Sequence, residues 1–301
     1  MNLQEMRYIV ALADTGHFGQ AAQACCISQP TLSSQIKKLE DYLGITLFDR
    51  SLKIVVPTAI GRHIIDSARL IVAEANHIRE LAQASHDPMS RDVRLGVIPT
   101  LGPYYLPRIL PWLHDTFCAL RLMLREEMTP HLLANLASGR LDAGLLALPV
   151  KDTSLVCVPL FVEPFFAAVP ADHPLANKNS IGIKELARTN LLLLEEGHCL
   201  RDQALDICQL ERPENEEMRA TSLETLRQMI ALGYGVTLVP ALASNTPQDY
   251  LDRLRIIPLD ARGAERTIGL VWRRRSHLGP TLTRLAEELK GRLPEGVFPA
   301  S

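Results

Sequence analysis

Residues 197–208 read GHCLRDQALDIC, with a histidine directly before one cysteine and a second cysteine nine positions later. The thiolate is the reactive form of cysteine, and nearby positive charge raises its fraction. Cys199 follows an apolar run and opens a helical pattern, so the free N–H groups of a helix N-terminus would favour its anion. His198 and Arg201 could add positive charge. The segment predicts a reactive thiol at Cys199; the competing interpretation is a buried, inert cysteine.

The second cysteine, Cys208, gives this thiol a mechanical role. If 199–208 is one helix, nine steps of about 1.5 Å separate the two Cα atoms by about 13 Å. A disulfide needs Cα atoms within about 7 Å of each other. The pair therefore cannot bond until the helix unwinds or bends, and the apolar stripe Leu200, Ala204 and Ile207 must then repack. This geometry predicts a thiol switch.

The composition limits where such a switch operates. A chain of 301 residues suggests about two domains, and 47% hydrophobic with 22% charged residues is typical of a soluble globular protein. The net charge of −2 carries no overall nucleic-acid signal, so any DNA contact must come from local arrangement.

Neither a secretory leader nor a membrane span is predicted. The N-terminus MNLQEMRYIV lacks a basic stretch followed by a long apolar run, and no apolar run approaches about 18 residues. We therefore expect a cytoplasmic protein without membrane partners, where a disulfide is transient and functional. The six cysteines lack paired zinc spacing, so neither a metal nor a cofactor is predicted. Four of them are interpreted as packing residues: Cys25, Cys26, Cys118 and Cys157.

The first 57 residues have the size and capping of a helix-turn-helix. The pattern ISQPTLSSQIKKLEDYLG offers Ser28 as an N-cap, Pro30 in the first turn and Gly44 as the end of the helix. RSLKIVVP is short and β-branched, as a hairpin or wing would be. Because residues 1–63 hold six Lys or Arg against five Asp or Glu, a solvated helix of an α-bundle is the alternative.

On the DNA-binding interpretation, polar side chains at the start of the second helix read base edges and cations meet phosphates. The candidate DNA-contacting residues are Ser28, Gln29, Pro30, Thr31, Ser33, Gln35, Lys37, Arg50 and Lys53.

A long helix is predicted to follow, over 58–87. Apolar residues from Ile60 through Ile64, Ala68 and Ile71 to Ala82 recur at spacings close to 3.5 residues. Such a seam is buried best against another helix, so we expect a dimerisation helix. The alternative is an amphipathic helix packed on its own domain.

Residues 88–301 alternate between strand and helix patterns, which indicates an α/β sheet. Strands are predicted at 93–98, 141–148, 190–195, 235–240 and 267–272. A long excursion before the last strand suggests two lobes, one from 88–162 plus 266–301 and one from 163–265.

Several polar residues fall at predicted strand-to-helix turns. Thr100 follows a strand, Thr129 precedes Pro130 as an N-cap would, and Cys199 and Ser222 open two further helices. Such turns gather at the C-terminal edge of a sheet, where ligands bind. Arg266, entering the last strand, could point into the same region.

The segment FGQAAQACCISQPTLSSQIKKLEDYLGITLFDR resembles the winged helix-turn-helix of LysR-type transcriptional regulators. The resemblance implies a recognition helix at about 28–43, a linker helix, and an effector domain of two α/β lobes similar to periplasmic binding proteins. The wing, 51–56, has Lys53 as its cation, fewer than many family members carry.

The segments EEGHCLRDQALDIC, ATSLETLRQMIALGYGVTLVPALA and ERTIGLVWR resemble the hydrogen-peroxide sensors of that family, the OxyR group. This resemblance implies a peroxidatic Cys199 and a resolving Cys208. It also implies a peroxide pocket that is lined by Thr100, Thr129, His198 and Arg266, with Asp202 close by.

The resemblance therefore implies a peroxide-responsive regulator of antioxidant promoters, and we do not expect an enzyme. The implied partners are double-stranded DNA, hydrogen peroxide, further copies in a dimer or tetramer, RNA polymerase, and thioredoxin-type or glutaredoxin-type reductants. Two alternatives are a LysR-type regulator that binds a small metabolite between its lobes, and a thiol peroxidase. Unchanged regulation after Cys199→Ser would favour the first, and sustained peroxide turnover would favour the second.

Overall fold

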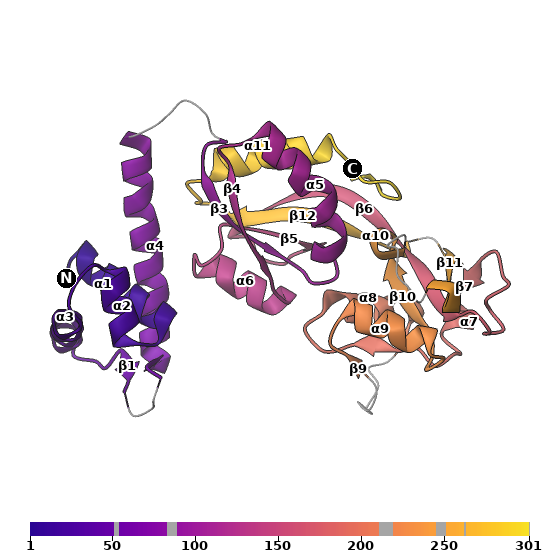
Figure 1. Ribbon diagram of the computed structural model, residues 1–301, viewed down its shortest axis with the longest axis horizontal. Coiled ribbons are helices and arrows are strands. Elements are labelled where there is room, and N and C mark those ends of the chain that lie inside the picture. Colours follow the sequence, from indigo (N-terminus) through magenta and orange to yellow (C-terminus); the bar gives the residue numbers. More distant parts are fainter. Residues whose placement is uncertain (51–53, 83–88, 211–218, 245–250, 262, 301) are drawn as a thin grey trace. The chain divides into compact units, whose positions relative to one another are not determined.

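The computed structural model describes the chain except residues 51–53, 83–88, 211–218, 245–250, 262 and 301 (Figure 1). It divides into two compact units. One comprises Met1–Asp87 with Ala137–Arg140, and the other Pro88–Leu136 with Leu141–Ser301.

Four helices and a small hairpin make up most of the described N-terminal unit. They are α1 (Leu3–Thr15), α2 (Phe18–Ala24), α3 (Gln29–Leu43), β1 (Phe48–Asp49), β2 (Val56–Pro57) and α4 (Ala59–Ala82). The hydrophobic residues Ile9, Leu12, Leu32, Ile36 and Leu47 are buried together in its core. This arrangement confirms the predicted helix-turn-helix followed by a hairpin.

The ends of α3 are set by local signals that the sequence carries. Ser28 is the N-cap and accepts a hydrogen bond from the backbone N–H of Thr31, at 3.3 Å. Pro30 lies in the first turn, and Gly44 closes the helix with a left-handed φ of 68°. These three predictions are confirmed. In the hairpin, Asp49 pairs with Val56, and the predicted DNA contact Lys53 lies outside the described residues.

The long helix α4 starts where expected, because the hydroxyl of Thr58 accepts a hydrogen bond from the N–H of Gly61. Ala68 faces the core, whereas Ile60, Ile71 and Ile78 of the predicted seam are 50%, 46% and 64% exposed. Within its own unit the helix therefore leaves much of its isoleucine stripe uncovered.

The C-terminal unit is built on a mixed sheet whose strands follow the order β4-β3-β5-β12-β6-β11-β7. These are β3 (Asp92–Val97), β4 (Arg121–Glu126), β5 (Ala143–Leu148), β6 (Leu155–Pro170), β7 (Ile181–Gly182), β11 (Leu254–Asp260) and β12 (Glu265–Arg273). Strands β10 (Thr237–Pro240) and β13 (Phe298–Pro299) also pair with β6. β8 (Leu193–Leu194) and β9 (Arg219–Ala220) form a separate parallel pair.

Helices flank this sheet, as the α/β prediction requires. They are α5 (Gly102–Thr116), α6 (Thr129–Ala137), α7 (Ile183–Leu186), α8 (Cys199–Cys208), α9 (Leu223–Ala231), α10 (Ala241–Ser244) and α11 (Gly279–Lys290), with a 3-10 turn at Leu251–Arg253. Figure 1 shows α5 and α11 over one face of β3, β5 and β12, and α6 over the other.

The strand predictions were partly wrong. Within the expected strand 190–195, only Leu193 and Leu194 form a strand. Leu191 adds a single bridge to Val236. The sixteen-residue strand β6 was not predicted at all. It pairs with β12 along its first part and with β10 and β11 along its last part, so the proposed lobe boundary at 162/163 falls inside one continuous strand.

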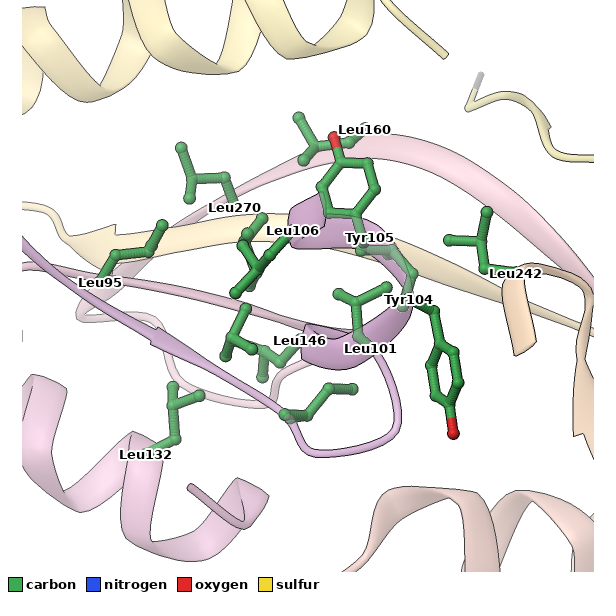
Figure 2. Close-up of a cluster of buried hydrophobic side chains, with 14 of the residues drawn as sticks. Leu95, Leu101, Tyr104, Tyr105, Leu106, Leu132, Leu146, Leu160, Leu242 and Leu270 are labelled. Atoms are coloured by element: carbon green, nitrogen blue, oxygen red, sulfur yellow. The ribbon is translucent and has the colours of Figure 1, made fainter. Parts of the chain in front are cut away.

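The core of this unit is rich in leucine and lies between the sheet and the helices that flank it, and Figure 2 shows a part of it, with Leu101 and Leu106 near α5 and Leu132 on α6. Tyr105 contacts Phe161 with ring centroids 5.1 Å apart. Figure 2 shows Tyr104 at the edge of the cluster with its ring directed away from the leucines, and Leu242 approaching from α10.

Among the described residues, we find no helix that combines the length and the hydrophobicity needed to cross a bilayer.

Candidate functional site

The two cysteines lie at opposite ends of one helix. α8 begins at Cys199, with His198 as its N-cap residue, and ends at Cys208, after which Gln209 adopts a left-handed φ of 53°. Both cysteines are free thiols. The predicted helix is confirmed, and a regular helix of this length holds the two Cα atoms about 13 Å apart. The buried side of α8 differs slightly from the expected stripe, because Leu205 and Cys208 are buried whereas Ile207 is only half-buried.

Cys208 lies in a hydrophobic cluster with Leu193, Leu205 and Val236, and its side chain is 3% exposed. Burial raises the pKa of its thiol from 9.0 to about 11. At neutral pH this thiol is therefore protonated and shielded while α8 is folded. It can react with a partner sulfur only after the end of the helix leaves its cluster.

This shift predicts how the stability of the reduced protein depends on pH. The folded-state pKa is raised, so the contribution is fully present below pH 9.0 and is lost as pH rises through about 11. The raised pKa of Cys208 contributes up to about 3 kcal/mol to the unfolding free energy. Urea unfolding of the reduced protein below pH 9.0 and near pH 11 measures the fall in unfolding free energy. In Cys208→Ala this fall should be smaller than in the wild type by about 3 kcal/mol. Equal losses in both proteins would contradict the shift.

His198 is not the cation that the sequence suggested. Its side chain is 3% exposed. Burial lowers the pKa of the imidazole, although a hydrogen bond to the backbone of Thr221 and the charge of Glu195 oppose the shift. Nε2 lies 3.2 Å from the carbonyl oxygen of Thr221, so Nε2 carries the proton and donates it. Nδ1 is then an acceptor, and it has no hydrogen-bond partner among the described residues.

Three loops that carry predicted site residues, those of Thr100, Thr129 and His198, lie close together at the N-terminal end of α8. A Cβ placed on Gly197 would lie 2.8 Å from the sulfur of Met128, and its φ of +94° favours glycine. Met128 and Pro99 line one cavity of about 480 Å³. Because Pro99, Met128 and Gly197 directly precede Thr100, Thr129 and His198, the predicted gathering of turns is present in this unit.

Thr129 is not an N-cap, contrary to the expectation. It is the first residue of α6, and the turn closes through the backbone bond from Leu132 N–H to Met128 O, at 2.9 Å. Its Oγ1 is buried and has no hydrogen-bond partner within the described chain. An unsatisfied buried hydroxyl is costly. Together with Nδ1 of His198, it offers a donor and an acceptor for a small polar molecule.

Arg266 and Thr100 are brought together, in a way that changes the role expected of the arginine. NH1 of Arg266 donates to Oγ1 of Thr100 at 2.9 Å, and NH2 donates to its carbonyl oxygen at 3.0 Å. Nε donates to Glu163 at 2.8 Å. Arg266 thus acts on Thr100 and Glu163, and Glu163 is a residue that the sequence reasoning missed. A carboxylate inside the apolar run FVEPFF was the available signal.

Arg201 and Asp202 follow each other in the first turn of α8 but differ in exposure. Asp202 is exposed, whereas the Arg201 side chain is 4% exposed and lies 3.8 Å from the carboxylate of the exposed Glu196. An acidic group in the first helical turn suits the helix dipole. Asp202 therefore lies at the solvent-facing side of the start of α8.

The other four cysteines are not uniformly packing residues. Cys25 and Cys157 are half-buried and the pKa of each is raised, chiefly by burial, but Cys26 and Cys118 are exposed. The packing interpretation is therefore wrong for Cys26 and Cys118.

Most of the candidate DNA-contacting residues are exposed on the surface of the N-terminal unit. Gln29, Pro30, Thr31 and Lys37 are exposed, and Ser33 and Gln35 are half-buried. Ser28 is exposed, but its hydroxyl is also engaged with Thr31, at 2.8 Å. Arg50, which is expected to contact a phosphate, forms an ion pair with Glu40 at 2.7 Å and lies over the Phe18 ring, and its DNA contact stays a prediction.

Comparisons with known proteins match both units. Residues 3–62 match the family model of the bacterial regulatory helix-turn-helix protein, lysR family, and residues 86–294 match the LysR substrate binding domain. The chain is 45% identical over 294 residues to the DNA-binding transcriptional dual regulator OxyR of Escherichia coli (strain K12), covering 97% of this chain and 96% of that protein.

Solved structures agree. A full-length OxyR from Pseudomonas aeruginosa, a cysteine-to-aspartate variant, matches with a TM-score of 0.84 at 39% identity, over 96% of this chain and 95% of that one. A reduced form of OxyR matches at 44% identity, with a TM-score of 0.63 over 69% of this chain and 98% of that one. An oxidised form matches at 46% identity, with a TM-score of 0.61 over 68% and 97%.

Proposed function

This chain belongs to the LysR family of bacterial transcriptional regulators, and from that premise we propose that it senses hydrogen peroxide through Cys199 and Cys208. The single observation that carries the assignment of these residues is that two free thiols terminate one ten-residue helix. Joining them requires that helix to deform, and deformation is what converts a chemical event into a signal.

The chemistry takes two steps. The thiolate of Cys199 attacks one oxygen of hydrogen peroxide, so that an S–O bond forms, the O–O bond breaks and hydroxide leaves. The sulfur is oxidised by two electrons to a sulfenic acid. The thiol of Cys208 then attacks that sulfur, a disulfide forms and water leaves. Thioredoxin-type or glutaredoxin-type thiols reverse the change by exchange.

The loops in front of α8 supply the groups that the first step needs. The hydroxyls of Thr100 and Thr129 donate hydrogen bonds to peroxide, and Nδ1 of His198 accepts one. Donors aimed at the departing oxygen stabilise the charge that develops on it. In this proposal Arg266 acts through Thr100, and Asp202 lies at the entrance beside the helix start.

The N-terminal unit binds double-stranded DNA in this proposal, with α3 as the recognition helix. The exposed side chains of Gln29, Thr31 and Lys37 are placed for bases and phosphates. The exposed isoleucines of α4 support self-association as a dimer, and further contacts between effector domains would give a tetramer. A regulator of this kind acts in the cytoplasm, engages RNA polymerase at antioxidant promoters, and is not an enzyme.

Peptide mapping of the disulfides after brief exposure to low peroxide tests this assignment. We expect a link between Cys199 and Cys208, with the other four cysteines recovered as free thiols. Electrophoretic mobility or footprinting on the same samples should show a changed pattern of DNA protection. A different link, or loss of thiols without any disulfide, overturns the assignment of the pair.

A further inference from the structure

A fully buried ion pair joins the two strands behind the peroxide site. Glu163 on β6 and Arg266 on β12 stand directly opposite each other in the antiparallel register, and both side chains are 0% exposed. Burial of two charges costs free energy that only close geometry and additional hydrogen bonds offset. Because a buried ion pair often adds little net stability to the fold, the position of this pair suggests that it also serves the site.

The polar atoms of this pair bind each other and also reach two further residues, Leu242 and Thr100. One carboxylate oxygen of Glu163 accepts from Nε of Arg266 at 2.8 Å, and the other accepts from the backbone N–H of Leu242, also at 2.8 Å. The side chain of Leu242 packs in the leucine-rich cluster, as Figure 2 shows. The carboxylate is therefore held at both oxygens, and it fixes the plane of the guanidinium. The Phe165 ring, 5.9 Å from Cζ of Arg266, limits that plane further.

The guanidinium in turn fixes Thr100. Because Oγ1 of Thr100 accepts a hydrogen bond from NH1 of Arg266, its own hydrogen must be donated in another direction. The second bond, from NH2 to the carbonyl oxygen of the same residue, holds the backbone of this turn. A hydroxyl that accepts from a cation is also a stronger donor, since hydrogen bonds in a chain polarise one another.

We propose that Glu163 is a positioning residue for peroxide reduction, which holds Arg266 so that the Thr100 hydroxyl is aimed at the leaving oxygen. This inference rests on the proposed peroxide-sensing function. In the attack of the Cys199 thiolate the O–O electron pair moves onto that oxygen, and the Thr100 hydrogen bond strengthens as its charge develops. Glu163 does not touch the peroxide. It acts through two intervening groups.

The test is Glu163→Gln in the full-length protein. Glutamine keeps the size of the side chain, but its single amide oxygen can replace only one of the two carboxylate oxygens, and its amide nitrogen cannot accept a hydrogen bond. We expect the second-order rate constant for oxidation of Cys199 by peroxide to fall between about tenfold and a hundredfold, because the Thr100 donor is misaligned but not lost, and outright loss of one oriented donor costs about a hundred- to thousandfold. Alkylation of Cys199 by iodoacetamide should stay within about twofold, because that reaction needs the thiolate and not the donor.

Asp142→Asn is the matched control. Asp142 is a buried carboxylate of the same unit, and it accepts hydrogen bonds from the backbone N–H of Arg94 at 2.9 Å and from its guanidinium at 2.6 Å. Its loss should leave the peroxide rate unchanged. If Glu163→Gln does not fold, the double variant Glu163→Gln/Arg266→Met replaces the buried charges by neutral groups of similar size, and it should be equally slow with peroxide.

The outcomes separate this inference from the proposed function. A wild-type rate in either variant overturns the role of Glu163, as does an equal fall in the peroxide and alkylation rates, which would mean that Glu163 acts on the thiol itself. If the wild-type protein forms no link between Cys199 and Cys208, the proposed function fails instead.

Discussion

Cys199→Ser abolishes the peroxide-dependent change in DNA binding, whereas Cys208→Ser stops the reaction after the first step, at the sulfenic acid. A serine hydroxyl remains protonated at neutral pH and does not attack peroxide, so we expect complete loss of the response. In Cys208→Ser the first step proceeds, and Cys199 should accumulate as a sulfenic acid that dimedone traps. The measurement is the DNA mobility shift with and without peroxide, together with mass spectrometry of the peptide that contains Cys199.

Matched controls come from the cysteines outside α8. Cys26→Ser and Cys118→Ser remove exposed thiols, and Cys157→Ser removes a half-buried one. Each should keep the wild-type response, because none belongs to α8 or to the segments that carry Thr100, Thr129 and His198. A response that survives Cys199→Ser, or that is lost in Cys118→Ser, would place the sensor elsewhere.

The features that the sequence predicted well are those decided by neighbouring residues. Ser28, Pro30 and Gly44 bound α3 through hydrogen bonds and dihedral angles within a few residues, and each is recognisable by its type. The extent of α8, Cys199–Cys208, likewise follows from a local helical pattern. The incompatibility between that helix and a disulfide then follows from the constant rise per residue.

The features that were missed depend on distant partners. β6 contains Pro159 and Pro164, residues that argue against a central strand, and its register with β12 shifts where Pro159 is paired. Glu163 appears in an apolar run with no local reason for its charge. Its partner Arg266 lies 103 positions away, and only the antiparallel register brings them together. The neutral state of His198 has the same origin, because its burial comes from tertiary packing.

Asp206→Pro provides the second large effect, an accelerated disulfide. Asp206 is an exposed position of α8, so the substitution removes little packing. Proline eliminates the backbone N–H that bonds to the preceding turn and clashes with its carbonyl, which costs a helix interior about 3 kcal/mol. If unwinding of α8 limits capture of the sulfenic acid by Cys208, that change speeds disulfide formation up to about a hundredfold, until the bond-forming step becomes limiting.

Asp206→Ala is the opposite substitution at the same site. It improves helix propensity and removes an acidic group from the last turn, where the helix dipole disfavours it, so α8 gains about 0.5–1 kcal/mol. The disulfide should then form about two- to fivefold more slowly than in the wild type. Rapid quenching in acid after a single pulse of peroxide, followed by alkylation in denaturant, gives both rates, because the Cys208 thiol is lost only in the second step. The burial of Cys208 requires this order of rates, proline fastest and alanine slowest. Three equal rates would contradict this prediction, because they would mean that opening of α8 does not limit formation of the disulfide.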